Sequence, residues 1–499
     1  MDLRLDATYG AFINNQFEIG NDSHFLATNP ATGETLAKIR RSGADVIDKA
    51  VQAASRAFAG WAATPIEERA RLMNKLADAI EQNLERLAHI DACDIGRRIG
   101  EIRLDYLLAI GQYRYYASAL MSLEGFSRPI PGGWHVTKRE PYGVCGQIIP
   151  WNVPAIMTAF KIAPAIAAGN TVVLKPDEHA TLSTLELCKL IATIFPPGVV
   201  NVVPGTGEEA GAALTAHPRV VKIAFTGSSE VGRIIGEAGA NRLVPVSLEL
   251  GGKSPNIVFP DADNLDGVID NASFAAMFCN GQSCLAGTRL FVHEDIYGSF
   301  MDRMLDRMSG LKVGSPLDED TRLGCLVSPR HGERVLNYIS IGKDEGAKLL
   351  LGGSRRTVKD NAYGYFIEPT VFEVSNNMRL AQEEIFGPVL SVIKWSNYDA
   401  MLAQANDVRY GLAAGVYTSN LKNALVTADR LQAGNVWINQ YVNMHDGVPF
   451  GGYKESGIGR EMGKEALHMY TQQKSITMAF DVPPSWFLPS AAPVPTAKS

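Results

Sequence analysis

The apolar positions of this chain follow two different periods, and each period predicts a different kind of element. From Asp45 to about Arg97 they recur at helical spacing with charged residues on the other face, which predicts two or three amphipathic helices. From Thr171 to Leu248 short β-rich runs alternate with helical runs, and a second such alternation extends from Ser254 to about Asn439. Because this alternation is typical of a parallel sheet covered by helices, we expect an α/β protein with two such domains.

Three further segments frame these alternations. The segment Asn29–Glu34 predicts a turn between short strands. The segment Pro129–Tyr142 is rich in proline and glycine, and we expect an irregular arm or linker there. The tail from Val482 is rich in proline and alanine, which we interpret as a mobile end or an interface strap.

Within the first alternation we expect strands over Thr171–Lys175, Val199–Val203, Val220–Phe225 and Val244–Leu248, and helices near Thr184–Ile194, Glu208–Leu214 and Glu230–Ala240.

Length, charge and composition exclude several classes of protein. At 499 residues, with 46% apolar and 20% charged residues, the chain is typical of a globular enzyme of two or three domains. A net charge of −6 without a basic run argues against a nucleic-acid partner. No run of about eighteen apolar residues predicts a membrane span, and the start of the chain lacks the apolar core of a secretory signal.

Scattered cysteines and histidines limit the redox and metal chemistry. The six cysteines form no C-x-x-C pair, so we expect reduced thiols and a cytoplasmic location. The nine histidines form no H-x-x-x-H pair and no cluster with cysteine, so no metal site is expected.

The segment Phe278–Cys284 offers one cysteine a place to react. Cys284 follows a Gly-Gln-Ser sequence, whose small residues allow backbone amides and a substrate to approach the sulfur. A carboxylate at Glu249 and an amide at Asn152 precede it in the chain. Taken singly, a cysteine is commonly a small buried hydrophobe, Glu249 a surface carboxylate and Asn152 a turn residue. Together, a nucleophile, a base and an amide donor are the parts that acyl chemistry on sulfur requires.

Two strand ends are candidate contacts for a dinucleotide. The segment Phe225–Gly232 follows an apolar strand and opens a helix, so its free amides could hold a pyrophosphate, although an ordinary turn capped by Ser228 is the alternative. The segment Lys175–Glu178 ends another apolar strand, and its carboxylates, Asp177 and Glu178, lie just past the strand end. They could accept the ribose hydroxyls and repel a 2′-phosphate, which favours NAD over NADP, although a solvated turn is the alternative. Two other glycine-containing segments, Gly205–Gly211 and Gly252–Ser254, lack the spacing of phosphate-binding motifs.

These residues belong to a longer series of motifs. With them the chain resembles the aldehyde dehydrogenase superfamily, in its hydrolytic, NAD-using branch, over nearly the whole length. The motifs stand in the family's order at Asn29–Glu34, Ile149–Asn152, Lys175–Glu178, Phe225–Ser228, Glu249–Lys253, Gly281–Cys284, Glu383–Val389 and Pro449–Gly457.

The resemblance implies a role for each matching residue. Cys284 is similar to the family's nucleophile, Glu249 to its general base, and Asn152, with the N–H of Cys284, to its oxyanion donors. Glu461 is similar to a second carboxylate that is assigned to a proton path in some members. The residues that match cofactor contacts are Ile148, Trp151, Lys175, Glu178, Gly227, Ser228, Gly232, Leu250, Glu384 and Phe386. The residues expected beside a substrate tunnel are Met157, Phe160, Ser283, Leu285 and Phe450.

The resemblance also implies the domains and the assembly. It implies a Rossmann-type NAD-binding domain over residues 1–122 and 142–250, and an α/β catalytic domain over residues 251–454. A small β oligomerisation arm with the tail would comprise residues 123–141 and 470–499, with a late strand near Lys474–Phe480. Such an arm implies a homodimer or a homotetramer.

The expected reaction is the NAD-dependent oxidation of an aldehyde to the carboxylic acid, through a hemithioacetal and a thioester on Cys284. Most of the expected tunnel residues are apolar, which favours an uncharged aliphatic, terpenoid or aromatic aldehyde, although several of them could equally be core. One alternative is a CoA-acylating aldehyde dehydrogenase, which would not need Glu249 as a base. Others are a cysteine hydrolase without a dinucleotide, which would need a histidine beside the sulfur, and a structural protein on an enzyme scaffold.

Overall fold

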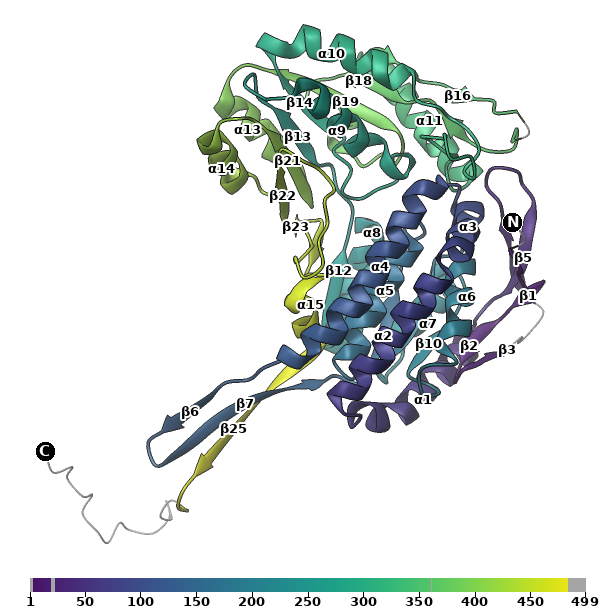
Figure 1. Cartoon of the computed structure of the whole chain (residues 1–499), viewed down its shortest axis with the longest axis vertical. Helices are drawn as coiled ribbons and strands as arrows, with labels where there is room; N and C mark the ends of the chain where they lie inside the picture. The colour runs from purple at the N-terminus through teal and green to yellow at the C-terminus, as the bar shows by residue number, and fades with distance from the viewer. Residues whose placement is uncertain (1–2, 19–22, 360, 483–499) are drawn as a thin grey trace, which may run out of the picture.

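The structure is a computed structural model that describes residues 3–18, 23–359 and 361–482. It consists of two α/β lobes, the first formed mainly by the N-terminal half of the chain, and a β arm that extends away from the first lobe (Figure 1). The α/β fold class predicted from the sequence is therefore confirmed. No helix among the described residues is long and apolar enough to cross a membrane.

The first lobe contains an eight-stranded sheet with the order β24-β12-β11-β8-β9-β10-β2-β3. Its five central strands are parallel: β8 (Val144–Ile148), β9 (Thr171–Lys175), β10 (Val200–Val202), β11 (Val220–Thr226) and β12 (Val246–Glu249). The antiparallel strands at its edges are β2 (Ala11–Ile13), β3 (Gln16–Glu18) and β24 (Gly457–Ile458).

Both faces of this sheet are covered by helices, as its alternating side chains require. Val172 and Leu174 in β9 join the apolar cluster of helices α2 to α6, whereas Val173 joins the cluster of α1, α7 and α8 on the other face. These helices are α1 (Ala44–Ala62), α2 (Ile66–Gln82), α3 (Leu84–Ile95), α4 (Ile99–Ala119), α5 (Pro154–Ala167), α6 (Leu182–Ile191), α7 (Ala212–Ala216) and α8 (Ser229–Arg242).

The predicted elements of this lobe are present, with one local difference. The helices expected between Asp45 and Arg97 are three, α1, α2 and α3. The helix expected near Glu208–Leu214 begins as a π-helical turn, η2 (Gly207–Gly211), before α7. The expected turn Asn29–Glu34 joins β4 (His24–Thr28) to β5 (Thr35–Arg40), and the N–H of Asn29 donates to the carbonyl of Glu34 over 2.8 Å. The short strand β1 (Thr8–Tyr9) completes that three-stranded sheet.

The second lobe contains a seven-stranded sheet in which only β15 is antiparallel to its neighbour. In spatial order its strands are β15 (Lys348–Leu351), β18 (Thr370–Glu373), β19 (Val389–Trp395), β14 (Arg289–His293), β13 (Pro255–Val258), β21 (Ala413–Tyr417) and β22 (Asn435–Ile438). Its helices are α9 (Leu265–Met277), α10 (Glu294–Ser309), α11 (Pro329–Asp344), α12 (Arg379–Gln382), α13 (Tyr398–Asn406) and α14 (Leu421–Arg430). The remaining short elements are η1 (Leu120–Ser122), η3 (Phe278–Gly281), β16 (Arg355–Arg356), β17 (Phe366–Ile367), β20 (Tyr410–Gly411), β23 (Tyr453–Lys454) and α15 (Gly463–Met469).

The arm is a three-stranded antiparallel sheet, so the expectation of an irregular segment over Pro129–Tyr142 was wrong. Its strands are β6 (Ser127–Ile130), β7 (Gly133–Pro141) and β25 (Thr471–Ala479), with β7 in the centre. The prolines are compatible with strands because Pro129 lies in the edge strand β6 and Pro141 ends β7. The late strand expected near Lys474–Phe480 is β25, and the tail beyond Val482 lies outside the described residues.

Candidate active site

The loop that carries Cys284 has a backbone conformation that needs support from its surroundings. Cys279, Asn280 and Gly281 have left-handed φ angles of 55°, 57° and 70°. Such angles are uncommon for residues other than glycine and persist only where neighbours fix them. Gly252 allows a close approach to this loop, because a Cβ there would lie 2.1 Å from the carbonyl oxygen of Cys284. The segment that follows Glu249 is thereby brought against the cysteine.

Cys284 is the reactive candidate among six free cysteines, since the other five are buried. It lines a cavity of about 760 Å³ with residues that include Asn152, Leu250, Gly251 and Glu384. Burial raises the pKa of its thiol to about 12, the carboxylates of Glu384 and Glu249 add to the rise, and the backbone N–H groups of Cys284 and Leu285 oppose it. The sulfur is therefore a thiol at neutral pH and must lose its proton when it attacks.

Glu249 is a buried carboxyl group with unused hydrogen-bonding capacity. It ends β12, is only 5% exposed, and neither of its carboxylate oxygens has a hydrogen-bond partner among the described residues. Burial raises the pKa of Glu249 well above its usual value, and the nearby Glu461 adds to this rise, whereas Lys161 and Arg460 oppose it. A carboxylate with a raised pKa and free acceptor atoms is suited to take a proton from water.

A buried ion pair lies beside Glu249. Lys161, which is fully buried in α5, donates to Oε1 of Glu461, while Oε2 of Glu461 has no partner among the described residues. The main chain of Glu461 exchanges two hydrogen bonds of 2.8 Å with Phe450. Lys161 was missed in the sequence, although a lysine within the apolar helix Pro154–Ala167 is a signal that could have identified it.

Asn152 connects the first lobe to the cysteine loop. It lies between β8 and α5, is 4% exposed, and its Nδ2 donates to the carbonyl of Gln282 over 2.9 Å. Asn152 and Cys284 line the same cavity. An amide donor beside a nucleophile is the combination that stabilises an oxyanion.

Six of the residues predicted to contact a cofactor line this cavity: Trp151, Gly227, Ser228, Leu250, Glu384 and Phe386. Ser228 caps α8, and its Oγ accepts from the N–H of Val231 over 3.3 Å, so the amides at the start of this 14-residue helix face the cavity end. The hydroxyl of Thr226 is buried without a partner among the described residues. A free hydroxyl and a helix N-terminus fit the phosphates of a dinucleotide.

Two residues of α11, His331 and Arg334, line the cavity and bond to the main chain of the segment that contains Glu384 and Phe386. The sequence offers no signal for either residue. His331 donates from Nε2 to the carbonyl of Phe386 over 2.7 Å, and its ring lies edge-on to Trp151 with the centroids 5.3 Å apart. Arg334 donates to the carbonyl of Glu384 over 2.9 Å. Phe386 has a φ of 63°, so these bonds fix a left-handed residue beside the cavity. Glu384 in turn accepts from the N–H of Gly252 over 2.9 Å.

Four predicted cofactor residues lie outside the wall of this cavity. Lys175 and Glu178 form an ion pair of 3.1 Å past the end of β9, and Ile148 ends β8. A Cβ on Gly232 would lie 2.5 Å from Leu250, so this glycine lets α8 approach that residue. Asp177, Glu178 and His179 have ligand atoms within 4.8 Å of one another, but Lys175 and His179 already occupy the two carboxylates.

The residues expected beside a substrate tunnel are all buried. Met157, Phe160, Leu285 and Phe450 belong to one apolar cluster, against which Cys284 also packs, and Ser283 is 8% exposed. None of the five lines the cavity described above. Their part in substrate binding stays a prediction.

The comparisons with known proteins agree with this site. The Aldehyde dehydrogenase family profile matches residues 18–476. The chain is 47% identical to DhaS of Bacillus subtilis over 479 residues, which cover 95% of this chain and 96% of that protein. It is similar to the NAD+ complex of an aldehyde dehydrogenase from Bacillus cereus, with a TM-score of 0.92, 44% identity, and coverage of 95% of this chain and 97% of that one. It is also similar to P. syringae indole-3-acetaldehyde dehydrogenase AldA in complex with NAD+ and IAA, with a TM-score of 0.93, 37% identity, and coverage of 95% and 97%.

The chain belongs to the aldehyde dehydrogenase family. It is an NAD-dependent aldehyde dehydrogenase, and the predicted family, enzyme class and cofactor are confirmed. The alternatives of a cysteine hydrolase without a dinucleotide and of a structural protein are thereby excluded. The residues of this cleft fit NAD. The N-terminus of α8 and the unpartnered hydroxyl of Thr226 suit the phosphates, and the aromatic side chains of Trp151 and Phe386 suit an aromatic ring.

Proposed function

We propose that this enzyme oxidises an uncharged aliphatic, terpenoid or aromatic aldehyde to the free carboxylic acid, with Cys284 as nucleophile, Asn152 as oxyanion donor and Glu249 as general base. The observation that carries the proposal is the convergence of the three groups. Cys284 and Asn152 line one cavity. Glu249 does not line that cavity, but it ends β12 three residues before Gly252, which packs against the carbonyl of Cys284, and its carboxylate contributes to the raised pKa of the thiol. No other cysteine of the chain is accessible.

In the first step the sulfur of Cys284 adds to the aldehyde carbon. The S–H bond breaks, an S–C bond forms, and the carbonyl oxygen gains the negative charge. The Nδ2 donor of Asn152 and the N–H of Cys284 stabilise that charge, and loss of one such donor costs about a hundredfold or more in rate. The high pKa of the thiol means that the proton must leave during the attack, and the unpartnered carboxylate of Glu249 is a suitable acceptor.

The second step needs a hydride acceptor, which NAD supplies when it is bound. In this step the tetrahedral carbon on Cys284 becomes a thioester. We propose Trp151, Gly227, Ser228, Glu384 and Phe386 as the residues that hold the cofactor at the cavity, with Lys175 and Glu178 at the adenosine ribose and Ile148, Gly232 and Leu250 as supporting contacts.

In the last step Glu249, once the proton from the first step has left it for solvent, removes a proton from a water molecule, whose oxygen attacks the thioester carbon. The C–S bond then breaks, the acid leaves, and the sulfur of Cys284 takes a proton from Glu249 and returns to the thiol. The ion pair of Lys161 and Glu461 lies beside Glu249 and could carry the proton further. This hydrolysis is what separates the proposal from a CoA-acylating enzyme, in which CoA would take the acyl group.

The substrate class rests on the apolar surroundings of the sulfur. Cys284 packs against the cluster that contains Met157, Phe160, Leu285 and Phe450, so an apolar aldehyde would be favoured there. The similar AldA protein carries indole-3-acetaldehyde in its name, which is an aromatic aldehyde of this kind.

The proposal is tested by a panel of aldehydes assayed for NADH formation, with the product identified with and without CoA. We expect the highest kcat/KM for uncharged apolar aldehydes and the free acid as product in both conditions. A preference for a charged semialdehyde would contradict the substrate class, and formation of an acyl-CoA would contradict hydrolysis.

We further propose a homodimer or homotetramer that forms through the arm. The arm strands expose apolar side chains, among them Trp134, Ile476 and Met478, which a single copy leaves uncovered. Light scattering after gel filtration should give two or four times 54.0 kDa. The free cysteines favour a reducing compartment such as the cytoplasm.

A further inference from the structure

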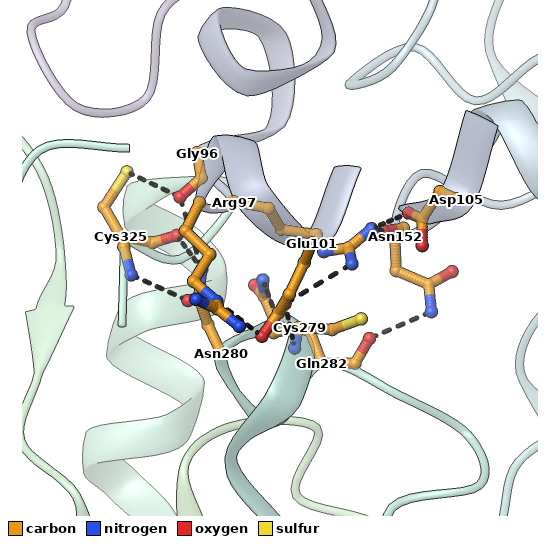
Figure 2. A network of polar contacts seen from close by, with 11 residues as sticks. Gly96, Arg97, Glu101, Asp105, Asn152, Cys279, Asn280, Gln282 and Cys325 are labelled. Carbon is orange, nitrogen blue, oxygen red and sulfur yellow. Dashed lines mark hydrogen bonds and ion pairs between the residues drawn. The ribbon is translucent and has the colours of Figure 1, made fainter. Parts of the chain in front are cut away.

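A buried polar network connects the junction of α3 and α4 to the cysteine loop (Figure 2). It begins at the junction of α3 and α4, where Gly96 ends α3 with a φ of 75° and Arg97 precedes α4. Arg97 is 1% exposed and Glu101 is 6% exposed. Arg97 lies 3.4 Å from Glu101 and also pairs with Asp105, so its buried charge is balanced.

Glu101 reaches across to the other lobe and contacts the main chain of the cysteine loop. Its Oε2 accepts from the N–H of Cys279 over 2.8 Å, and its Oε1 accepts from Arg98 over 2.9 Å. Cys279 is the first of the three left-handed residues, so this hydrogen bond fixes the loop where its backbone is least favourable.

Arg97 contacts the other half of the site. Its Nη1 donates to the main-chain carbonyl of Asn152 over 3.1 Å, and the side chain of Asn152 donates to the carbonyl of Gln282. Two neighbouring side chains therefore hold both the residue proposed as oxyanion donor and the loop of the proposed nucleophile. Figure 2 shows Glu101 reaching Cys279 and Asn152 reaching Gln282 of the loop.

The remaining polar residues of the loop anchor it to the second lobe. Asn280 accepts from the N–H of Gly324 over 2.8 Å and donates to the carbonyl of Cys325 over 2.8 Å. Gln282 accepts from the N–H of Val327 over 3.1 Å. Asn280 also donates to the carbonyl of Gly96 in the first lobe over 3.3 Å. Among the described residues, Glu101 and Asn152 are the first-lobe side chains that bond to the main chain of the loop, and of these two Glu101 holds the left-handed residue Cys279.

We propose that Glu101, with Arg97, is a positioning residue that fixes the distance between the sulfur of Cys284 and the amide of Asn152. This inference rests on the proposed function of these two residues. Glu101 does not touch the substrate; it acts through the main chain of Cys279, five residues before the sulfur. A displacement of about 1 Å in a reacting group can cost on the order of a hundredfold in rate.

The test compares three substitutions that separate hydrogen-bond geometry from charge. Glu101→Gln keeps an oxygen at the position that accepts from Cys279 but removes the charge. Glu101→Asp keeps the charge but withdraws the oxygen by one methylene, and Glu101→Ala removes both. Arg103→Ala is the matched control, because Arg103 lies on the same helix and pairs across the lobes with Glu319 at the surface.

The readouts are the single-turnover rate of NADH formation, KM for the aldehyde, the melting temperature, and the pH profile of Cys284 alkylation by iodoacetamide. We expect Glu101→Gln and Arg103→Ala to stay within about threefold of the wild-type rate. Glu101→Asp and Glu101→Ala should be slower by about ten- to a hundredfold, with KM changed by less than about threefold and a shifted alkylation profile.

The proposal is overturned if Glu101→Gln is slower than Glu101→Asp, or if all variants form NADH at the wild-type rate. It is also overturned if the variants lose NADH formation only in proportion to their loss of folded protein, and the folded protein that remains shows the wild-type pH profile of Cys284 alkylation. If Glu101→Ala fails to fold, the comparison of Gln with Asp decides. Failure of the proposed function would look different, since Cys284→Ala would then still produce NADH whatever stands at position 101.

Discussion

The side-chain amide of Asn152 donates to the carbonyl of Gln282 over 2.9 Å, across 130 residues of sequence. This bond joins the first lobe to the loop that carries Cys284, and it holds the side-chain amide of Asn152 in one orientation. An amide held in this way is already oriented before a carbonyl arrives, which is the condition for effective stabilisation of an oxyanion.

Asn152→Ala should lower the single-turnover rate of NADH formation by about a hundredfold, because one oxyanion donor is lost. Asn152→Asp should be lowered further, since a carboxylate would repel the developing charge. The control is Asn271→Ala in α9, which removes an amide that donates only to Gly267 within its own helix. A rate for Asn152→Ala within a factor of two of the control would contradict the assignment.

The preference for NAD over NADP should depend on Glu178. Glu178→Gln removes a carboxylate that would repel a 2′-phosphate and frees the amine of Lys175, now 3.1 Å from it, to contact that phosphate. We expect the ratio of kcat/KM for NADP to that for NAD to rise by about tenfold, which corresponds to 1.4 kcal/mol. Glu208→Gln, an exposed carboxylate of the same lobe, should leave the ratio unchanged. An unaltered ratio in Glu178→Gln would place the ribose contact elsewhere.

His331 should affect cofactor binding more than chemistry. Burial lowers the pKa of His331 to about 4, so it is neutral above pH 5 and its ring N–H holds the carbonyl of Phe386. His331→Ala removes this bond and should raise KM for NAD by about three- to tenfold with little change in kcat. His331→Gln, which can still donate, should be closer to wild type. A new pH dependence of kcat between pH 6 and 9 in His331→Gln would instead show that the histidine takes part in proton transfer.

The stability of the protein should reveal the raised pKa of Glu249. Because the folded state raises this pKa, Glu249 contributes stability while it is protonated, and this contribution is lost as the pH rises from the ordinary carboxyl pKa through the folded value. Glu249→Gln, which cannot ionise, should therefore be more stable than wild type at pH 8 by at least about 1 kcal/mol. The difference should vanish near pH 4. Denaturant unfolding at the two pH values measures it, and equal stability at pH 8 would contradict the buried, unpartnered state of the carboxyl.

The strand and helix alternation predicted the two main sheets because apolar runs in parallel strands, such as Thr171–Lys175, are buried on both faces. The prolines of the arm predict an interruption of strands, whereas Pro129 lies in an edge strand where no N–H is needed. Cys284 stood out because of its small neighbours. His331 and Glu101 gave no local signal, because their roles arise from main-chain atoms of Phe386 and Cys279 that only tertiary structure brings near.

The central claim is that the acyl group passes through a thioester on Cys284 that Glu249 helps to hydrolyse. The most direct measurement is mass spectrometry of Glu249→Gln after mixing with NAD and an aldehyde such as benzaldehyde. We predict one burst of NADH per site and a benzoyl adduct on the peptide that contains Cys284, with neither in the double variant that also carries Cys284→Ala. Continued turnover of Glu249→Gln without an adduct, or an adduct on another residue, would contradict the account.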